Sequence, residues 1–240
     1  VLEALGTALA GWRARAINAN EVAVWTAAVA AATAAPTAPT RPSDAQVIGA
    51  VQRSVGEDAI VVCAAGGLPG ELHKLWRTAR SGGYHVEYGY SCMGYEIAGG
   101  VGVKMAAPDR EIVVMVGDGS YLMLNSELAT SVLLGQKLIV VVLDNGGFGC
   151  IHRLQHATGG AAFNNLLADA RHVTLPAIDF AAHAASLGAL SEHVADIAGL
   201  EAALARARAA PRSYVVVIDT DPRQTTDAGG WWWNVAVPEV

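Results

Sequence analysis

Two runs of almost uninterrupted apolar residues, Ile112–Val116 and Leu138–Leu143, constrain the fold more than any other feature of this chain. A strand that is apolar at every position is buried on both faces, which is typical of a parallel sheet covered by helices on each side. Each run ends in a short, glycine-containing polar segment. The two runs therefore predict the central strands of an α/β domain.

Four other segments have the length and composition of strands, and helical segments separate most of the six. The expected strands are Ala59–Ala64, His85–Tyr90, Glu111–Val116, Lys137–Leu143, Leu190–Val194 and Ser213–Asp219. This alternation predicts a doubly wound α/β fold, with a mainly parallel six-stranded sheet and helices on both faces. We also expect a helix after a capping box at Ser43 and Gln46, a helix over Tyr121–Leu134, and a last helix capped by Asp196.

The two ends of the chain differ from the segment between them. Residues 1–35 are alanine-rich and predict helix, and three prolines between Pro36 and Pro42 predict an extended linker. We therefore expect residues 1–42 to be the end of a preceding domain with its linker, 43–222 to be the folded domain, and 223–240 to be a tryptophan-rich extension. The chain begins with Val1 and lacks a signal-peptide pattern, so we expect a cut point within a longer protein.

Charge and cysteine content exclude several kinds of partner. The formal net charge is −6 and the basic residues are scattered, so neither nucleic acid nor an anionic membrane surface is expected. The three cysteines lack CxxC spacing, which argues against a disulfide scaffold or a zinc site and favours the reducing cytoplasm. No apolar run reaches the ~20 residues of a membrane span.

The candidate site lies in the polar segments that follow the two apolar runs, because ligands of open parallel sheets bind at the carboxyl ends of strands. After the first run, Gly117, Gly119 and Ser120 allow close backbone approach to an anion such as a diphosphate. Asp118 and Asn145, with a loop carbonyl, are the hard oxygen ligands that Mg²⁺ prefers. No cysteine or histidine accompanies them, which disfavours zinc.

A Gly-Asp-Gly segment alone is a common strand-to-helix turn, but here 24 residues, Ser120 to Leu143, separate it from Asp144-Asn145. This layout resembles the thiamine-diphosphate signature of the acetolactate synthase and pyruvate decarboxylase superfamily, and the resemblance covers nearly all of residues 43–220. It implies thiamine diphosphate and Mg²⁺ as cofactors, with Asp118, Asn145 and the Gly147 carbonyl as metal ligands. The chain departs from the family pattern in having Asp144 where an asparagine is common.

The same resemblance extends to the loops upstream. Ser91-Cys92-Met93-Gly94 takes the place of the family's Gly-Thr-Met-Gly turn, which implies that Met93 holds the cofactor in its bent conformation and that the Ser91 carbonyl accepts a hydrogen bond from the aminopyrimidine amine. Without the resemblance, Met93 would be read as core packing. The implied cofactor-binding residues are Gly66, Gly67, Ser91, Cys92, Met93, Gly117, Asp118, Gly119, Ser120, Asn145, Gly147 and Phe148.

Three segments, Gly83–Glu96, Gly66–Lys74 and Phe148–Gln155, are similar to the trihydroxycyclohexane-dione hydrolase family of myo-inositol breakdown. This implies hydrolysis of a C–C bond in a cyclic 1,2-diketone. It also implies that the catalytic glutamate lies in a separate N-terminal domain, so no catalytic residue is assigned here and the chain alone should be inactive. The cofactor of the family lies between two subunits, which implies at least a dimer.

Three alternatives stay open at this point. One is an acetolactate-synthase-like or decarboxylating enzyme acting on a 2-keto acid, because the cofactor motifs are shared among these chemistries. Another is a non-catalytic assembly module that keeps only the fold. A dinucleotide-binding domain is the weaker alternative, because no GxGxxG follows the first expected strand.

Overall fold

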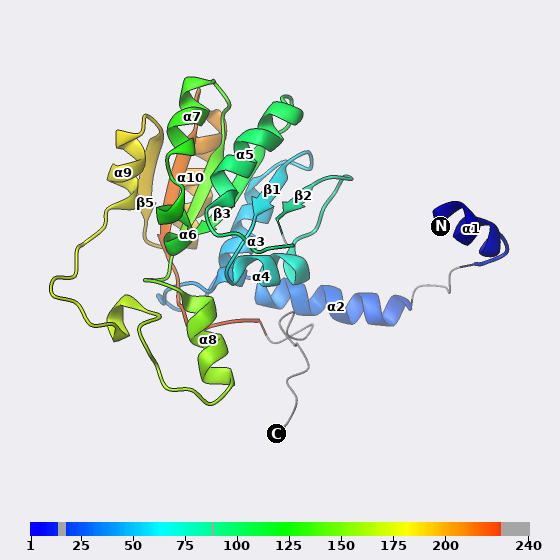
Figure 1. Ribbon diagram of the computed structural model, residues 1–240, viewed down its shortest axis with the longest axis horizontal. Coiled ribbons are helices and arrows are strands. Elements are labelled where there is room, and N and C mark those ends of the chain that lie inside the picture. The colour runs from blue at the N-terminus through cyan, green and yellow to red at the C-terminus, as the bar shows by residue number, and fades with distance from the viewer. Residues whose placement is uncertain (14–17, 88, 227–240) are drawn as a thin grey trace.

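The computed structural model describes residues 1–13, 18–87 and 89–226, and its centre is a six-stranded parallel sheet (Figure 1). The strands lie in the order β2-β1-β3-β4-β6-β5. Their bounds are β1 Ile60–Cys63, β2 Tyr84–Val86, β3 Ile112–Gly117, β4 Ile139–Asp144, β5 Leu190–Val194 and β6 Tyr214–Asp219. The α/β fold is confirmed, and every pairing between these strands is parallel.

Helices cover both faces of the sheet (Figure 1). Their bounds are α1 Leu2–Ala8, α2 Ala19–Ala32, α3 Asp44–Ser54, α4 Leu68–Leu75, α5 Tyr95–Ala106, α6 Asp118–Met123, α7 Glu127–Leu133, α8 Gly149–Ala157, α9 Phe180–Ser186 and α10 Ile197–Ala209, with a short 3₁₀ helix at Leu167–Asp169. Side chains of α3, α4 and α10 pack on one face, and side chains of α5, α6, α7 and α9 pack on the other.

The apolar strands fill two cores at once. Along β3, Val113 and Met115 join the core under α3, α4 and α10, whereas Val114 and Val116 join the core under α5, α6, α7 and α9. All four side chains are at most 1% exposed. Successive strand residues point to opposite faces, so a strand buried on both sides needs an apolar residue at every position.

The helix boundaries marked by capping residues are confirmed. The Ser43 hydroxyl accepts a hydrogen bond from the Gln46 N–H at 3.3 Å, and Gln46 Oε1 accepts one from the Ser43 N–H at 2.9 Å. At the start of α10, Asp196 Oδ1 accepts a hydrogen bond from the Gly199 N–H at 2.7 Å. These side chains satisfy N–H groups that have no partner within the helix.

The prediction of a single helix over Tyr121–Leu134 is wrong. The chain forms α6 and α7 instead, and the backbone leaves the helical conformation at Leu124, with φ −151° and ψ 65°. Asn125 and Ser126 follow, and such residues compete with a helical backbone through their own side chains. In addition, α6 begins at Asp118, earlier than the expected helix.

The second strand is shorter than expected and ends at Val86 rather than Tyr90. Beyond it, the Glu87 side chain accepts hydrogen bonds from the Tyr90 N–H at 3.0 Å and the Cys92 N–H at 2.7 Å. These N–H groups bond to a carboxylate instead of a neighbouring strand, so residues 89–92 form a loop.

The helical prediction for residues 1–35 is confirmed only in part, because α1 and α2 are separate helices with mostly exposed side chains. The C-terminal half of α2 contacts the domain, where Val29 joins the core beneath α3. None of the helices in the described ranges is long and apolar enough to cross a membrane. The tryptophans expected to mark the C-terminal extension, Trp231–Trp233, lie outside the described residues.

Candidate functional site

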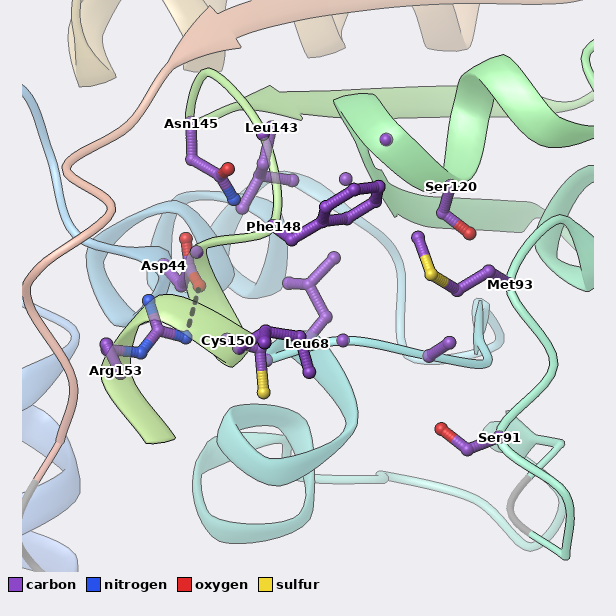
Figure 2. A pocket seen from close by; sticks show the side chains of 18 residues that line it. Asp44, Leu68, Ser91, Met93, Ser120, Leu143, Asn145, Phe148, Cys150 and Arg153 are labelled. Carbon is purple, nitrogen blue, oxygen red and sulfur yellow. Dashed lines mark ion pairs between the residues drawn. The ribbon is translucent and has the colours of Figure 1, made fainter. Parts of the chain in front are cut away.

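A pocket lies at the carboxyl ends of β1, β3 and β4, where the loops after these three adjacent strands converge (Figure 2). The loop after β1 contributes Gly66 and Gly67, and the segment before α5 contributes Ser91 and Met93. The remaining lining residues are Asp44, Ala65, Leu68, Gly117, Gly119, Ser120, Leu143, Asn145, Gly147, Phe148, Gly149, Cys150, Ile151 and Arg153. The parallel sheet thus brings together segments that are far apart in the sequence.

Ten of the twelve expected cofactor-binding residues line this pocket: Gly66, Gly67, Ser91, Met93, Gly117, Gly119, Ser120, Asn145, Gly147 and Phe148. Cys92 is exposed outside the lining, and its N–H bonds to Glu87. Asp118 also lies outside the lining, because it is buried behind the pocket wall with 4% of its surface exposed.

The Asp118 carboxylate joins the loop after β3 to the loop after β4. Its Oδ2 atom accepts a hydrogen bond from the Gly147 N–H at 2.8 Å. Burial and the nearby charge of Asp144 raise the pKa of Asp118 to about 7, against the opposing effect of the N–H groups of Gly119, Gly147 and Asn145. A buried carboxylate in this setting is stabilised in its charged form by an added cation.

Two buried oxygen atoms beside this junction lack a hydrogen-bond partner among the described residues: Oδ1 of Asp118 and Oδ1 of Asn145. Leaving such an atom unpaired costs about 1–3 kcal/mol. Both are hard oxygen ligands, so the residues fit a small divalent cation such as Mg²⁺. The described segments contain no cluster of three or more His, Cys, Asp or Glu residues that could hold a metal, so such an ion would also depend on amide, backbone and ligand oxygens.

Close backbone approach in this region depends on glycine. A Cβ atom on Gly119 would lie 2.8 Å from the Phe148 ring, and one on Gly147, whose φ is 140°, would lie 2.5 Å from the Asn165 carbonyl oxygen. Neither position accommodates a side chain without displacement of its neighbours. Gly119 allows the loops after β3 and β4 to meet, and Gly147 allows the loop after β4 to pack against the backbone of Asn165.

Glu96 is a structural residue of this site that the sequence analysis missed, as it missed Asp44 and Arg153 in the pocket lining. It is 1% exposed, and its carboxylate accepts hydrogen bonds from the Ser120 hydroxyl at 2.8 Å, the Gly94 N–H at 3.0 Å and the Ala65 N–H at 3.3 Å. Burial raises the pKa of this carboxyl, and these hydrogen bonds oppose the rise. One side chain therefore ties together three pocket segments: the loop after β1, the turn before α5 and the first turn of α6.

Glu87 performs a similar role for the loop that carries Ser91 and Met93. Hydrogen bonds from the N–H groups of Cys92 and Tyr90 hold the pKa of Glu87 below its usual value. Between these two donors, Ser91 has a positive φ of 51°. The bonds to Glu87 thereby support an uncommon backbone conformation next to the Met93 side chain in the pocket wall.

Glycine loops at the carboxyl ends of three parallel strands define an α/β domain of the kind that binds a phosphate-bearing cofactor. Residues 64–218 match the family described as thiamine pyrophosphate enzyme, C-terminal TPP binding domain, and the chain belongs to this family. Membership implies thiamine diphosphate as the cofactor.

Among individual proteins, the chain is 44% identical over 200 residues to the 3D-(3,5/4)-trihydroxycyclohexane-1,2-dione hydrolase of Bacillus thuringiensis (strain Al Hakam). It is also 44% identical over 200 residues to the enzyme of the same name from Geobacillus thermodenitrificans (strain NG80-2). Each match covers 81% of this chain and 31% of the relative, so the chain spans about a third of the length of these hydrolases. The expected resemblance is confirmed.

A solved structure supports the fold. The thiamine diphosphate-dependent 4-hydroxybenzoylformate decarboxylase of Rhodococcus jostii RHA1 matches with a TM-score of 0.69 over 78% of this chain and 34% of that chain. The sequence identity is 21%, so this similarity bears on architecture and not on the reaction.

Proposed function

We propose that this chain is the diphosphate-binding part of a thiamine-diphosphate- and Mg²⁺-dependent hydrolase that cleaves a C–C bond of trihydroxycyclohexane-1,2-dione, a cyclic 1,2-diketone of myo-inositol breakdown. The observation that carries the proposal is the junction of Asp118 with the Asn145–Gly147 loop, where two buried oxygen atoms have no hydrogen-bond partner within the part of the chain that the structure describes. The identity to hydrolases of that name supports the substrate class.

In this proposal, Asp118 and Asn145 hold Mg²⁺ through their side chains and Gly147 through its carbonyl. Backbone N–H groups of Gly119 and Ser120, with those of the glycines in the loop after β1, donate hydrogen bonds to the diphosphate oxygens. Thiamine diphosphate, when bound, supplies a nucleophilic carbon and an electron sink for C–C cleavage.

The other expected contacts orient the cofactor's rings. Met93 supports the bent conformation and the Ser91 carbonyl orients the aminopyrimidine, with Cys92 beside them. Met93, Leu68 and Phe148 present apolar groups to the pocket (Figure 2) and help to exclude water from it.

The complete enzyme requires more than these residues. In the proposal, a glutamate from a separate N-terminal domain of another subunit moves the proton on the aminopyrimidine, so the enzyme is at least a dimer that acts in the cytoplasm on a small-molecule substrate. We therefore expect the isolated 240-residue chain to show no turnover. Ring opening of the diketone by the isolated chain would contradict this assignment of the catalytic glutamate.

Cofactor binding tests the proposal directly. Isothermal titration of the 240-residue chain with thiamine diphosphate is expected to show binding that depends on Mg²⁺. Asp118→Asn should remove the Mg²⁺ dependence, whereas Asp58→Asn, at an exposed aspartate paired with Arg80, should not. Absence of Mg²⁺-dependent binding, even with the N-terminal domain supplied, would favour a non-catalytic assembly module instead.

Substrate choice needs the complete protein that carries this chain. Incubated separately with the cyclic diketone and with pyruvate, it should open the ring of the diketone and leave pyruvate unchanged. Conversion of pyruvate to acetolactate, or its decarboxylation, without diketone hydrolysis would support a 2-keto acid enzyme.

A further inference from the structure

Arg153 is the one cationic side chain among the described residues that line the pocket. It projects from α8, and its side chain is 11% exposed. Figure 2 shows it beside Asp44 at the opposite end of the pocket from Ser91. The resemblance places the aminopyrimidine near Ser91. Arg153 therefore lies at the other end of the pocket, which is left for the diphosphate end of the cofactor.

The guanidinium group lies against the start of α4. A Cβ atom on Gly67 would overlap Arg153 Nη2, so any other residue at position 67 would displace the guanidinium from the place it occupies. Gly67 is the N-cap residue of α4, and neither α4 nor α8 has a side-chain cap. The N-terminal turns of both helices, with their partial positive charge, thus border the same part of the pocket as the arginine.

Among the described residues, most of the hydrogen-bonding capacity of Arg153 is unused. Nη1 donates to the Pro222 carbonyl at 2.9 Å, which fixes the position of the side chain. Nη2 lies 3.9 Å from Asp44 Oδ2, which is an ion pair but too long for a hydrogen bond. A guanidinium carries five N–H donors, and in the described part of the chain Arg153 has no other hydrogen-bond acceptor.

We propose that Arg153 binds the diphosphate group of thiamine diphosphate, adding a fixed positive charge to that of the cation held by Asp118 and Asn145. The inference rests on the proposed function. A diphosphate carries more negative charge than one divalent cation neutralises, and arginine matches phosphate oxygens through paired N–H donors. Pro222 and Asp44 hold the guanidinium in place before the anion binds.

The test compares two ligands that differ only in the diphosphate. Thiamine diphosphate and thiamine are titrated into the 240-residue chain with saturating Mg²⁺, for wild type, Arg153→Gln, Arg153→Lys and the control Arg206→Gln, at an exposed arginine paired with Glu192. We expect Arg153→Gln to weaken thiamine diphosphate binding by about tenfold or more and to leave thiamine binding unchanged. Arg153→Lys should retain part of the affinity, and Arg206→Gln all of it.

Equal affinity of wild type and Arg153→Gln for thiamine diphosphate would overturn the proposal. An equal loss of affinity for thiamine diphosphate and thiamine would also overturn it, because it would indicate that Arg153 acts only structurally, through its hydrogen bond to Pro222. If the glutamine variant does not fold, Arg153→Lys decides: several-fold weaker binding of thiamine diphosphate alone supports the proposal, and unchanged binding overturns it. Failure of the proposed function gives a different result, because wild type itself would then show no Mg²⁺-dependent binding.

Discussion

The Ser120 hydroxyl donates a hydrogen bond to the Glu96 carboxylate at 2.8 Å, and both side chains are buried, 4% and 1% exposed. The Gly94 N–H bonds to the same pair, at 2.8 Å to Ser120 Oγ and 3.0 Å to Glu96 Oε2. Through this arrangement the turn before α5 and the first turn of α6 hold a common position, which places Met93 and Ser120 in the wall of one pocket.

Replacement of Glu96 should therefore disturb both folding and cofactor binding. In Glu96→Gln one carboxylate oxygen becomes an NH₂ group that cannot accept a hydrogen bond, and a buried donor left unpaired costs about 1–3 kcal/mol. We expect a lower melting temperature and roughly tenfold weaker binding of thiamine diphosphate, measured by calorimetry. Glu201→Gln, at a partly exposed glutamate paired with Arg53, is the matched control and should change neither. Wild-type binding and stability in Glu96→Gln would show that this carboxylate does not organise the pocket.

Asp118→Asn should stabilise the chain in the absence of Mg²⁺ while removing its response to the ion. Wild type buries a carboxylate with one oxygen that has no partner among the residues described, and the neutral amide avoids the cost of burying that charge. We expect thermal unfolding to show a higher melting temperature for the variant without Mg²⁺. We also expect the increase caused by Mg²⁺ with thiamine diphosphate to occur only in wild type. A variant that keeps the Mg²⁺-induced increase would exclude Asp118 as a ligand.

Gly147→Ala and Gly102→Ala form a pair of substitutions with opposite expected effects. At Gly147, with φ 140°, the added Cβ would lie 2.5 Å from a backbone oxygen, so the free energy of unfolding should fall by about 2 kcal/mol or more. At Gly102, inside α5, nothing lies within 4 Å of the added atom, and alanine should stabilise the helix by roughly 0.5–1 kcal/mol. Urea unfolding measures both, and similar effects at the two positions would refute the steric argument.

Asp44 should make stability depend on pH in acid. Burial raises the pKa of Asp44 from 3.8 to about 6, with Arg153 opposing the rise and Glu71 adding to it. The folded state therefore holds this proton more tightly than the unfolded state. Protonation of Asp44 therefore contributes to the free energy of unfolding. This contribution is fully present below about pH 4 and is lost as the pH rises through about 6.

In Asp44→Asn the neutral amide resembles the protonated carboxyl group and cannot lose a proton. The variant therefore does not show this fall in the free energy of unfolding as the pH rises. Relative to wild type, its free energy of unfolding should rise by about 2–3 kcal/mol between about pH 4 and about pH 7. Urea unfolding at several pH values measures the difference. Parallel stability curves for the two proteins would contradict the raised pKa.

Local sequence predicted the elements of the fold because their signals lie within a few residues. The Ser43 and Gln46 pair marks the start of α3, and continuous apolar runs mark β3 and β4. Where nearby side chains redirect the backbone, prediction was weaker, as in the break before α7 and the early end of β2. The loops after β3 and β4 were identifiable as candidate sites because parallel strands place their carboxyl ends at one edge.

By itself, then, the sequence determined which segments become buried strands, where most helices begin, and which glycine loops follow the strands. Only the tertiary structure decided that Glu96 joins segments whose bonded residues lie 24 and 31 residues away, and that Arg153 lies against Gly67. Strand burial and helix capping depend on periodicity and near neighbours, which a sequence displays directly. The contacts of a buried carboxylate or guanidinium are with groups that sheet packing brings together from distant parts of the chain. No local sequence pattern predicts such contacts.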